Sequence, residues 1–203
     1  GIITKHSASK TKKWKRYLHH RNGKYQIMDR RMIEERKELF PKCETREEIG
    51  HWEWDTVVWI KWWSKEVILT HVERKTGYLL TKKLLRWTGQ CVTEATKELF
   101  SNTSVPAHKK LSVTYDNGME FSEHRMIEFE TKMTVFFAHP YHSWERWINE
   151  NTNWLLRQFI PKKTDFKYTT EKQLQYYTGL INNRPRERLG WLTPHEVFHD
   201  LTL

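Results

Sequence analysis

Three acidic residues stand in sequence contexts that suit metal-dependent chemistry. Asp116 follows a short β-rich run and precedes Asn117-Gly118, so we expect its carboxylate at a strand end beside a turn. Asp55 lies in an earlier β-rich run, and Glu150 lies in a later helical pattern. Mg²⁺ takes oxygen ligands from proteins, uses few carboxylates and keeps several waters. We therefore interpret the three acids as ligands of a divalent-metal site.

Two such ions, Mg²⁺ with Mn²⁺ as its substitute, would support displacement at phosphorus. Held about 4 Å apart, they activate a water or a 3′-hydroxyl and stabilise the departing oxygen. Any single acid among the 25 in the chain is most simply a solvated surface group. The set of three is more specific, because the expected fold would bring all of them to one point.

The elements that would position these acids follow a clear order. Three β-rich runs predict an antiparallel meander, at residues 52–58, 66–73 and 77–85. Two further strands, each reached through a helix, are predicted as helix 89–101, strand 110–115, helix 122–133 and strand 134–138. Strands joined through helices pair in parallel by right-handed crossovers. The remaining predicted helices are 32–40 before the meander and 144–159, 171–182 and 193–198 after the last strand.

This order is that of an α/β, ribonuclease H-like fold: a five-stranded mixed sheet, with three antiparallel then two parallel strands, flanked by helices. The first and fourth strands are neighbours in that topology, so Asp55 and Asp116 would face each other across the sheet. Glu150 comes two helical turns after Ser143, a candidate helix cap, and would lean over the same edge.

Length and charge predict one domain with a basic appendage. The chain has 203 residues and a net charge of +10, of which residues 1–31 carry +9. We interpret residues 1–48 as a basic linker or arm and residues 49–203 as the catalytic core with its C-terminal helices. Lys12, Lys13 and Arg16 of the arm suit a polyanion such as DNA, because each neutralised phosphate releases counterions. The alternative is a solvated tail without a partner.

Composition also excludes several classes of protein. No apolar run approaches the roughly 18 residues of a spanning helix, and no leader opens the chain, so we expect a cytoplasmic protein with no membrane partner. Cys43 and Cys91 lack CxxC spacing, which argues against a disulfide framework or a cysteine zinc site.

Eight segments of the chain resemble the integrase core of bacterial transposases of the insertion-sequence-thirty type. They are His51–Val58, Val72–Thr76, Asp116–Phe121, Phe137–Tyr141, Ser143–Arg146, Asn149–Asn153, Leu155–Gln158 and Asn182–Arg186. The resemblance covers roughly residues 45–200, and the 33 residues between Asp116 and Glu150 match the spacing of this family's acid triad.

The resemblance implies a DDE transposase with Asp55, Asp116 and Glu150 as catalytic metal ligands. Such an enzyme nicks DNA at the ends of its element and uses the freed 3′-hydroxyl to attack target DNA. It would act on nucleoid DNA in a bacterium and assemble as a homo-oligomer on that DNA. Family members also carry an N-terminal helix-turn-helix region, which is not found in this sequence, so we expect a fragment or a truncated copy.

Seven residues near the motifs are candidate DNA contacts: Asn149, Asn151, Arg157, Tyr141, Trp144, Arg184 and Arg186. The three on the Glu150 helix would contact phosphate or orient a metal-bound water, and the alternative is that they are simply solvated. The two aromatic residues would either line the DNA groove or pack at the start of that helix. The last two arginines would touch backbone phosphate.

Tryptophan is unusually frequent, with eleven residues against eight glycines. Where the resembling family normally has glycine, this chain has tryptophan at 54, 59, one of 62 and 63, 147 and 154. Three explanations stay open: a decaying copy, a site adapted to large side chains, or UGA codons that mean glycine in the source's genetic code; we favour the third. Two functional alternatives also stay open, a catalytically impaired DNA-binding remnant and a related ribonuclease H-like integrase or nuclease.

Overall fold

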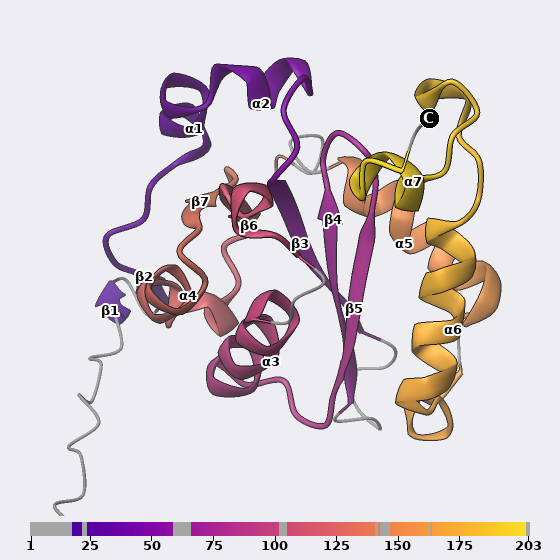
Figure 1. The fold of residues 1–203 in the computed structure, drawn as a ribbon. Coiled ribbons are helices and arrows are strands. Elements are labelled where there is room, and N and C mark those ends of the chain that lie inside the picture. Colours follow the sequence, from indigo (N-terminus) through magenta and orange to yellow (C-terminus); the bar gives the residue numbers. More distant parts are fainter. Residues whose placement is uncertain are drawn as a thin grey trace, which may run out of the picture.

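The computed structural model describes residues 18–21, 24–58, 66–101, 105–140, 142, 147–162 and 164–201. Figure 1 shows one central sheet with α3 and α4 on one face and α5 and α6 on the other. The bounds of these helices are Gly89–Ser101 for α3, His124–Thr131 for α4, Trp147–Phe159 for α5 and Glu171–Asn182 for α6. No helix in these described ranges is long and apolar enough to cross a membrane.

The central sheet has five strands in the order β5-β4-β3-β6-β7. The strands are β3 (His51–Val58), β4 (Val67–Glu73), β5 (Leu79–Leu84), β6 (Ser112–Tyr115) and β7 (Thr134–Phe137). The first three pair antiparallel, and β6 pairs parallel with both β3 and β7. The predicted mixed sheet and the neighbouring first and fourth strands are therefore confirmed.

Side chains alternate between the two faces of the sheet, and each face has its own hydrophobic core. Trp52 and Trp54 of β3 pack in a cluster with α3, α4 and their flanking strands. Val57 of the same strand packs in a second cluster, which includes Leu155 and Leu156 of α5. Successive side chains of a strand point to opposite faces, so one strand serves both clusters.

The segment before the core forms several short elements. A two-stranded sheet, β1 (Leu18–Arg21) with β2 (Lys24–Ile27), precedes α1 (Ile33–Leu39) and α2 (Pro41–Thr45). The strands were not predicted, because each is only four residues long and neither alternates clearly. The second helix begins at Pro41, where the predicted helix ends, because proline is tolerated in a first helical turn. Ile27 is 5% exposed and belongs to the core cluster, whereas the domain boundary at residue 48 stays a prediction.

Three other boundaries differ in detail from the prediction. The strand predicted from residue 110 begins at Ser112, because the 3₁₀ turn η1 (Ala107–Lys109) precedes it. The helix predicted over 122–133 is observed as α4, His124–Thr131, which follows η2 (Met119–Phe121) and is capped by Lys132 with a left-handed φ of 62°. The predicted start of α5 at Trp144 lies outside the described residues. The remaining short elements are η4 (Phe166–Tyr168), η5 (Glu187–Leu189) and α7 (Pro194–Phe198).

Candidate active site

The register of β3 and β6 brings Asp55 and Asp116 to the same level of the sheet. The paired residues are His51 with Ser112, Trp52 with Val113 and Glu53 with Thr114. The same offset of 61 residues sets Asp55 level with Asp116, which follows the last residue of β6. Both acids are partly exposed. The parallel register therefore places Asp55, within β3, at the level of Asp116, directly after the end of β6.

Asp55 is held by a side chain that the sequence prediction did not include in the site. Asn153 of α5 donates from Nδ2 to Asp55 Oδ2 at 2.7 Å, and the Thr56 backbone N–H donates to Asp55 Oδ1 at 2.8 Å. The Thr70 hydroxyl lies 3.4 Å from Asn153 Oδ1 and 3.2 Å from the Asp55 carbonyl oxygen. The sequence could have indicated Asn153 as a site residue, because it lies three residues after Glu150, a spacing that puts both side chains on one side of a helix.

Asn149 also docks α5 onto β3. Its side chain is 1% exposed, and Nδ2 donates to the carbonyl oxygen of Trp54 at 3.1 Å. Its Oδ1 is buried without a hydrogen-bond partner in the described part of the chain. This predicted DNA contact is therefore used inside the protein, between the helix that carries Glu150 and the strand that carries Asp55.

Glu150 lies in the first turn of α5, with an exposed side chain. Within the described ranges, no three His, Cys, Asp or Glu side chains are gathered closely enough to hold a metal ion. The structure thus brings together Asp55 and Asp116 and docks the Glu150 helix beside Asp55 through Asn153. The closed triad of Asp55, Asp116 and Glu150 stays a prediction.

Glu120 is a further acid near this pair, and the sequence analysis did not count it in the site. Burial, together with the charges of Asp116 and Asp55, raises the pKa of Glu120 to about 7. A hydrogen bond from Trp87 acts in the opposite direction. The sequence did offer an indication of Glu120, because this residue lies in Asp116–Phe121, one of the segments that carry the family resemblance. Burial is the largest cause of this shift, and the contributions of Asp116 and Asp55 place Glu120 near both aspartates.

The turn after β6 fixes the orientation of Asp116. The Gly118 backbone N–H donates to Asp116 Oδ1 at 2.9 Å, which closes an Asx-type turn. A Cβ on Gly118 would lie 2.4 Å from Glu120 Oε2, so a side chain at this position requires the Glu120 carboxylate to move. Asn117 donates from Nδ2 to the carbonyl oxygen of Ala138 at 2.6 Å, and Arg30 donates to Asn117 Oδ1.

These donors fit a hard divalent cation. Asp55 and Asp116 offer carboxylate oxygens at one level of the sheet, and repulsion from their charges adds to the effect of burial in raising the pKa of Glu120. A cation would relieve this repulsion. Asp55 is also oriented by an amide N–H of Asn153, as metal-binding carboxylates commonly are.

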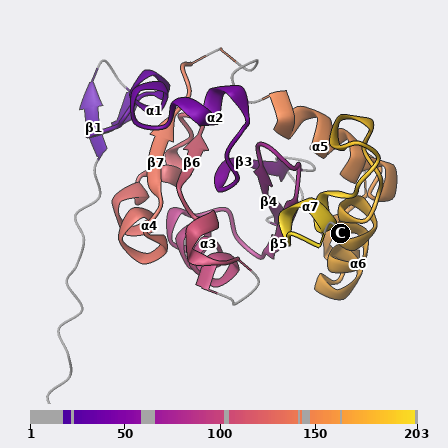
Figure 2. The same ribbon diagram turned by 45° about the horizontal axis from the view of Figure 1, so that its top comes forward.

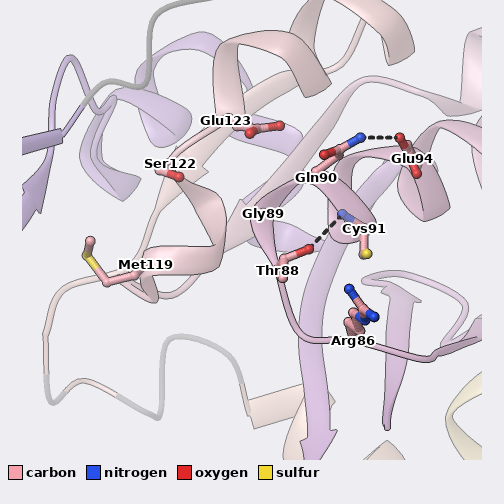
Figure 3. Close-up of a pocket in the computed structure, with 9 residues that line it drawn as sticks. All are labelled: Arg86, Thr88, Gly89, Gln90, Cys91, Glu94, Met119, Ser122 and Glu123. Carbon is pink, nitrogen blue, oxygen red and sulfur yellow. Dashed lines mark hydrogen bonds between the residues drawn. The ribbon is translucent and has the colours of Figure 1, made fainter. Parts of the chain in front are cut away.

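A pocket of about 550 Å³ lies between the start of α3 and the turn that carries Glu120. Figure 3 shows its lining, which comprises Arg86, Thr88, Gly89, Gln90, Cys91, Glu94, Met119, Ser122 and Glu123. The Cys91 backbone N–H donates to the Thr88 hydroxyl at 3.3 Å, and Gln90 donates to Glu94 at 2.9 Å. The lining combines one arginine with two glutamates, so its charge selects neither an anion nor a cation.

The other candidate DNA contacts are spread over the C-terminal helices. Asn151 and Arg184 are exposed, and Arg157 is partly exposed. Arg186 donates from Nη2 to the carbonyl oxygen of Ile181 at 3.2 Å, so part of its guanidinium is used to end α6. Burial, with the charges of Arg184 and Arg188, lowers the pKa of Arg186. Five predicted contacts lie outside the residues whose side chains are described: Lys12, Lys13, Arg16, Tyr141 and Trp144.

The structure accommodates the tryptophans that it describes in two ways. Trp54 is 1% exposed and packs edge to face against Phe121, with ring centroids 4.2 Å apart, and against Tyr115 at 5.5 Å. Its side chain lies in the core, as predicted from the strand alternation. Trp154 on α5 is 61% exposed. The tryptophans at 59, 62 and 63 and the side chain of Trp147 lie outside the described part.

Comparison with known proteins identifies transposases of insertion sequence elements that are similar in sequence to this chain. The chain is 38% identical over 169 residues to the transposase for insertion sequence element IS4351 of Bacteroides fragilis, covering 83% of this chain and 49% of that protein. It is 36% identical over 154 residues to transposase InsI for insertion sequence element IS30A of Escherichia coli, covering 76% and 39%. This chain thus spans about half the length or less of these relatives. No family model matches it.

A solved structure shows the same fold. The catalytic core domain of BIV integrase matches with a TM-score of 0.57 and 20% identity, covering 76% of this chain and 96% of that domain. The chain therefore belongs among the homologues of IS30-type insertion-sequence transposases and has the ribonuclease H-like fold of an integrase catalytic core.

Proposed function

We propose that this chain is the catalytic region of a DNA transposase. It would cleave DNA at the ends of an insertion sequence and join the freed 3′-hydroxyl to target DNA. The observation that carries the proposal is the pair Asp55 and Asp116 at one level of adjacent parallel strands, with the Glu150 helix docked beside Asp55 through Asn153. The relatives are named as transposases of insertion sequences, which supports this reaction.

Asp55, Asp116 and Glu150 would hold two Mg²⁺ ions, with Mn²⁺ as a substitute. When bound, the ions supply activation of a water or a 3′-hydroxyl and stabilise charge on the departing oxygen. The protein supplies orientation. Asn153 and the Thr56 N–H fix the Asp55 carboxylate, and the Gly118 N–H fixes that of Asp116.

DNA is the partner in this proposal, both as element ends and as target, and the protein would assemble as a homo-oligomer on it. Its net charge of +10 favours a polyanion. Arg157, Asn151 and Arg184 lie at surfaces from which phosphate contacts can be made. The basic arm with Lys12, Lys13 and Arg16 would add salt-dependent affinity, and Tyr141 and Trp144 would line the DNA groove. In a bacterium, the site of action would be nucleoid DNA.

A strand-transfer assay tests the proposal. Pre-cut donor ends and a plasmid target are incubated with the chain in Mg²⁺ and then in Mn²⁺. The unaltered chain should give joined product, and Glu150→Gln should lower the rate at least about a hundredfold, because neutralising a metal-binding carboxylate removes charge stabilisation from the transition state. Glu187→Gln, at an exposed acid of η5, is the matched control and should join DNA at the unaltered rate.

Equal joining by Glu150→Gln and the unaltered chain would refute the assigned triad. Nicked product without joined product would favour a nuclease. A chain that binds DNA but gives neither product in either metal would favour the impaired DNA-binding remnant. The observation behind that last alternative is the indole of Trp154, which is exposed one turn beyond Glu150 on the same helix.

A further inference from the structure

The segment before α1 lies directly against the end of β7. Phe137 donates its backbone N–H to the carbonyl oxygen of Arg31 at 2.8 Å, and Met32 forms a parallel bridge with Phe137. In Figure 2, α1 lies beside β7. Glu34 extends the contact, with Oε1 3.1 Å from His139 Nε2. Residues 29–34, which include the start of α1, thus lie along β7 at the edge of the sheet. We call this segment the connector.

The connector reaches the turn that carries Asp116 through one side chain. Arg30 donates from Nη1 to Asn117 Oδ1, and its guanidinium carbon lies 6.0 Å from the centre of the Phe137 ring. Asn117 uses the other end of its amide to donate to the carbonyl oxygen of Ala138 at 2.6 Å. The amide of Asn117 is therefore held from two sides, by the connector and by the residue after β7.

These two hydrogen bonds of Asn117 lie next to Asp116, the proposed metal ligand. Asn117 lies between Asp116 and Gly118, and the Gly118 N–H holds Asp116 Oδ1. A change in the Asn117 side chain would turn the peptide that presents this N–H. The Asp116 carboxylate would then lose its fixed direction.

We propose that Arg30 is a positioning residue for Asp116, acting through Asn117. The proposal rests on the proposed function, because it gives Asp116 the role of metal ligand. It also makes the connector part of the active-site scaffold. The proposed hold is specific to Arg30, since its neighbour Arg31 pairs with Glu128 on α4 instead.

A purely electrostatic role for Arg30 and a positioning role predict opposite changes in metal affinity when the side chain is removed. A guanidinium near the acids repels a divalent cation, so removing its charge would tighten metal binding. Loss of positioning would weaken metal binding, because the Asp116 carboxylate must then be ordered by the ion. The direction of the change therefore separates the two roles.

The test compares Arg30→Met, Arg30→Lys and the control Arg31→Met in the 203-residue chain. Mn²⁺ affinity is measured by electron paramagnetic resonance, and amide exchange at Gly118 is followed in the metal-free chain. Arg30→Met should weaken Mn²⁺ binding about tenfold, as expected for one charge-assisted hydrogen bond, and should speed exchange at Gly118 by a similar factor. Arg30→Lys, which keeps an N–H donor at the end of a side chain of similar length, should retain most of both, and Arg31→Met should change neither.

A double-mutant cycle with Asn117→Ala identifies the route of the effect. If Arg30 acts through Asn117, Arg30→Met should add almost nothing to Asn117→Ala. Additive effects on exchange at Gly118, tighter Mn²⁺ binding in Arg30→Met, or unchanged exchange in every variant would each overturn the proposal. Thermal unfolding checks that the variants fold, and Arg30→Ala replaces Arg30→Met if Arg30→Met does not fold.

These readouts are independent of DNA joining. If the unaltered chain fails to join DNA, the proposed function is in doubt, but exchange at Gly118 still tests the contact between Arg30 and Asn117. Joining by the unaltered chain together with unchanged exchange in Arg30→Met would instead refute the positioning role alone.

Discussion

Asn153 Nδ2 lies 2.7 Å from Asp55 Oδ2, and this contact joins the helix of Glu150 to the strand of Asp55. A helix docked only by apolar contacts can shift by a fraction of a side chain. The amides of Asn153 and Asn149 give α5 two directional contacts with β3. The distance between Glu150 and Asp55 therefore depends on these two asparagines.

Asn153→Ala should lower the strand-transfer rate about tenfold to a hundredfold, because an unrestrained carboxylate orients the metal poorly. The thermal midpoint should change little, since Asn153 is partly exposed. Gln158→Ala, at an exposed position of the same helix, is the control. Equal rates for Asn153→Ala and the control would show that Asp55 does not depend on this contact.

The raised pKa of Glu120 predicts a pH dependence of stability. A carboxyl whose folded pKa of about 7 exceeds its unfolded value near 4.5 stabilises the fold fully below pH 4.5. That contribution is lost as the pH rises through 7. Glu120→Gln should therefore raise the free energy of unfolding at pH 8 relative to the unaltered chain, with a smaller difference at pH 4.5.

Denaturant unfolding at the two pH values measures this difference for Glu120. The control Glu187→Gln should show no such pH-dependent gain. Mg²⁺ should reduce the gain at pH 8, because a bound cation offsets the repulsion from Asp55 and Asp116. A Glu120→Gln curve parallel to that of the unaltered chain from pH 4.5 to 8 would contradict the burial of an acid beside this pair.

His71 predicts sensitivity to acid. Burial lowers its pKa well below the usual value, and neither ring nitrogen has a hydrogen-bond partner among the described residues. Its ring packs edge to face on Phe100 at 5.0 Å. A group with a depressed folded pKa contributes stability above its unfolded pKa of about 6.5, and that contribution is lost as the pH falls.

His71→Phe should therefore lose less free energy of unfolding between pH 7.5 and pH 5 than the unaltered chain does. Denaturant titrations at both pH values measure this loss. His108→Phe, at an exposed residue of η1, is the control and should follow the unaltered chain. An identical loss in His71→Phe and the unaltered chain would mean that His71 does not titrate in this range.

Trp54 and Trp154, the tryptophans at family glycine positions whose side chains the structure describes, should respond differently to substitution. Trp54→Gly should cost about 3 to 5 kcal/mol of unfolding free energy, because it leaves a cavity among Phe121, Tyr115 and His71. Trp154→Gly should cost about 1 kcal/mol, the helix propensity of glycine at an exposed site. Chemical denaturation measures both.

A more stable Trp54→Gly variant would contradict this packing. It would instead favour the hypothesis that glycine belongs at this position. Sequencing the gene tests that hypothesis directly, since UGA codons at the five tryptophan positions support it and ordinary UGG codons remove it.

The sequence by itself determined the order of the five strands of the central sheet and the positions of Asp55 and Asp116 along them. Period-two alternation and turn residues define strands locally, and right-handed crossovers through helices favour parallel pairing within the sheet. From this order the adjacency of β3 and β6 was predicted, and the pairing confirms it. The burial of Trp54 followed from the same alternation.

The tertiary structure alone decided which polar side chains serve the site. Asn149 and Asn153 face β3 because of how α5 packs on the sheet, and Glu120 lies near Asp55 because η2 folds the chain back after Asp116. Arg30 and Asn117 are 87 residues apart. Such contacts depend on packing between distant segments, whereas residue types and spacing report only local conformation.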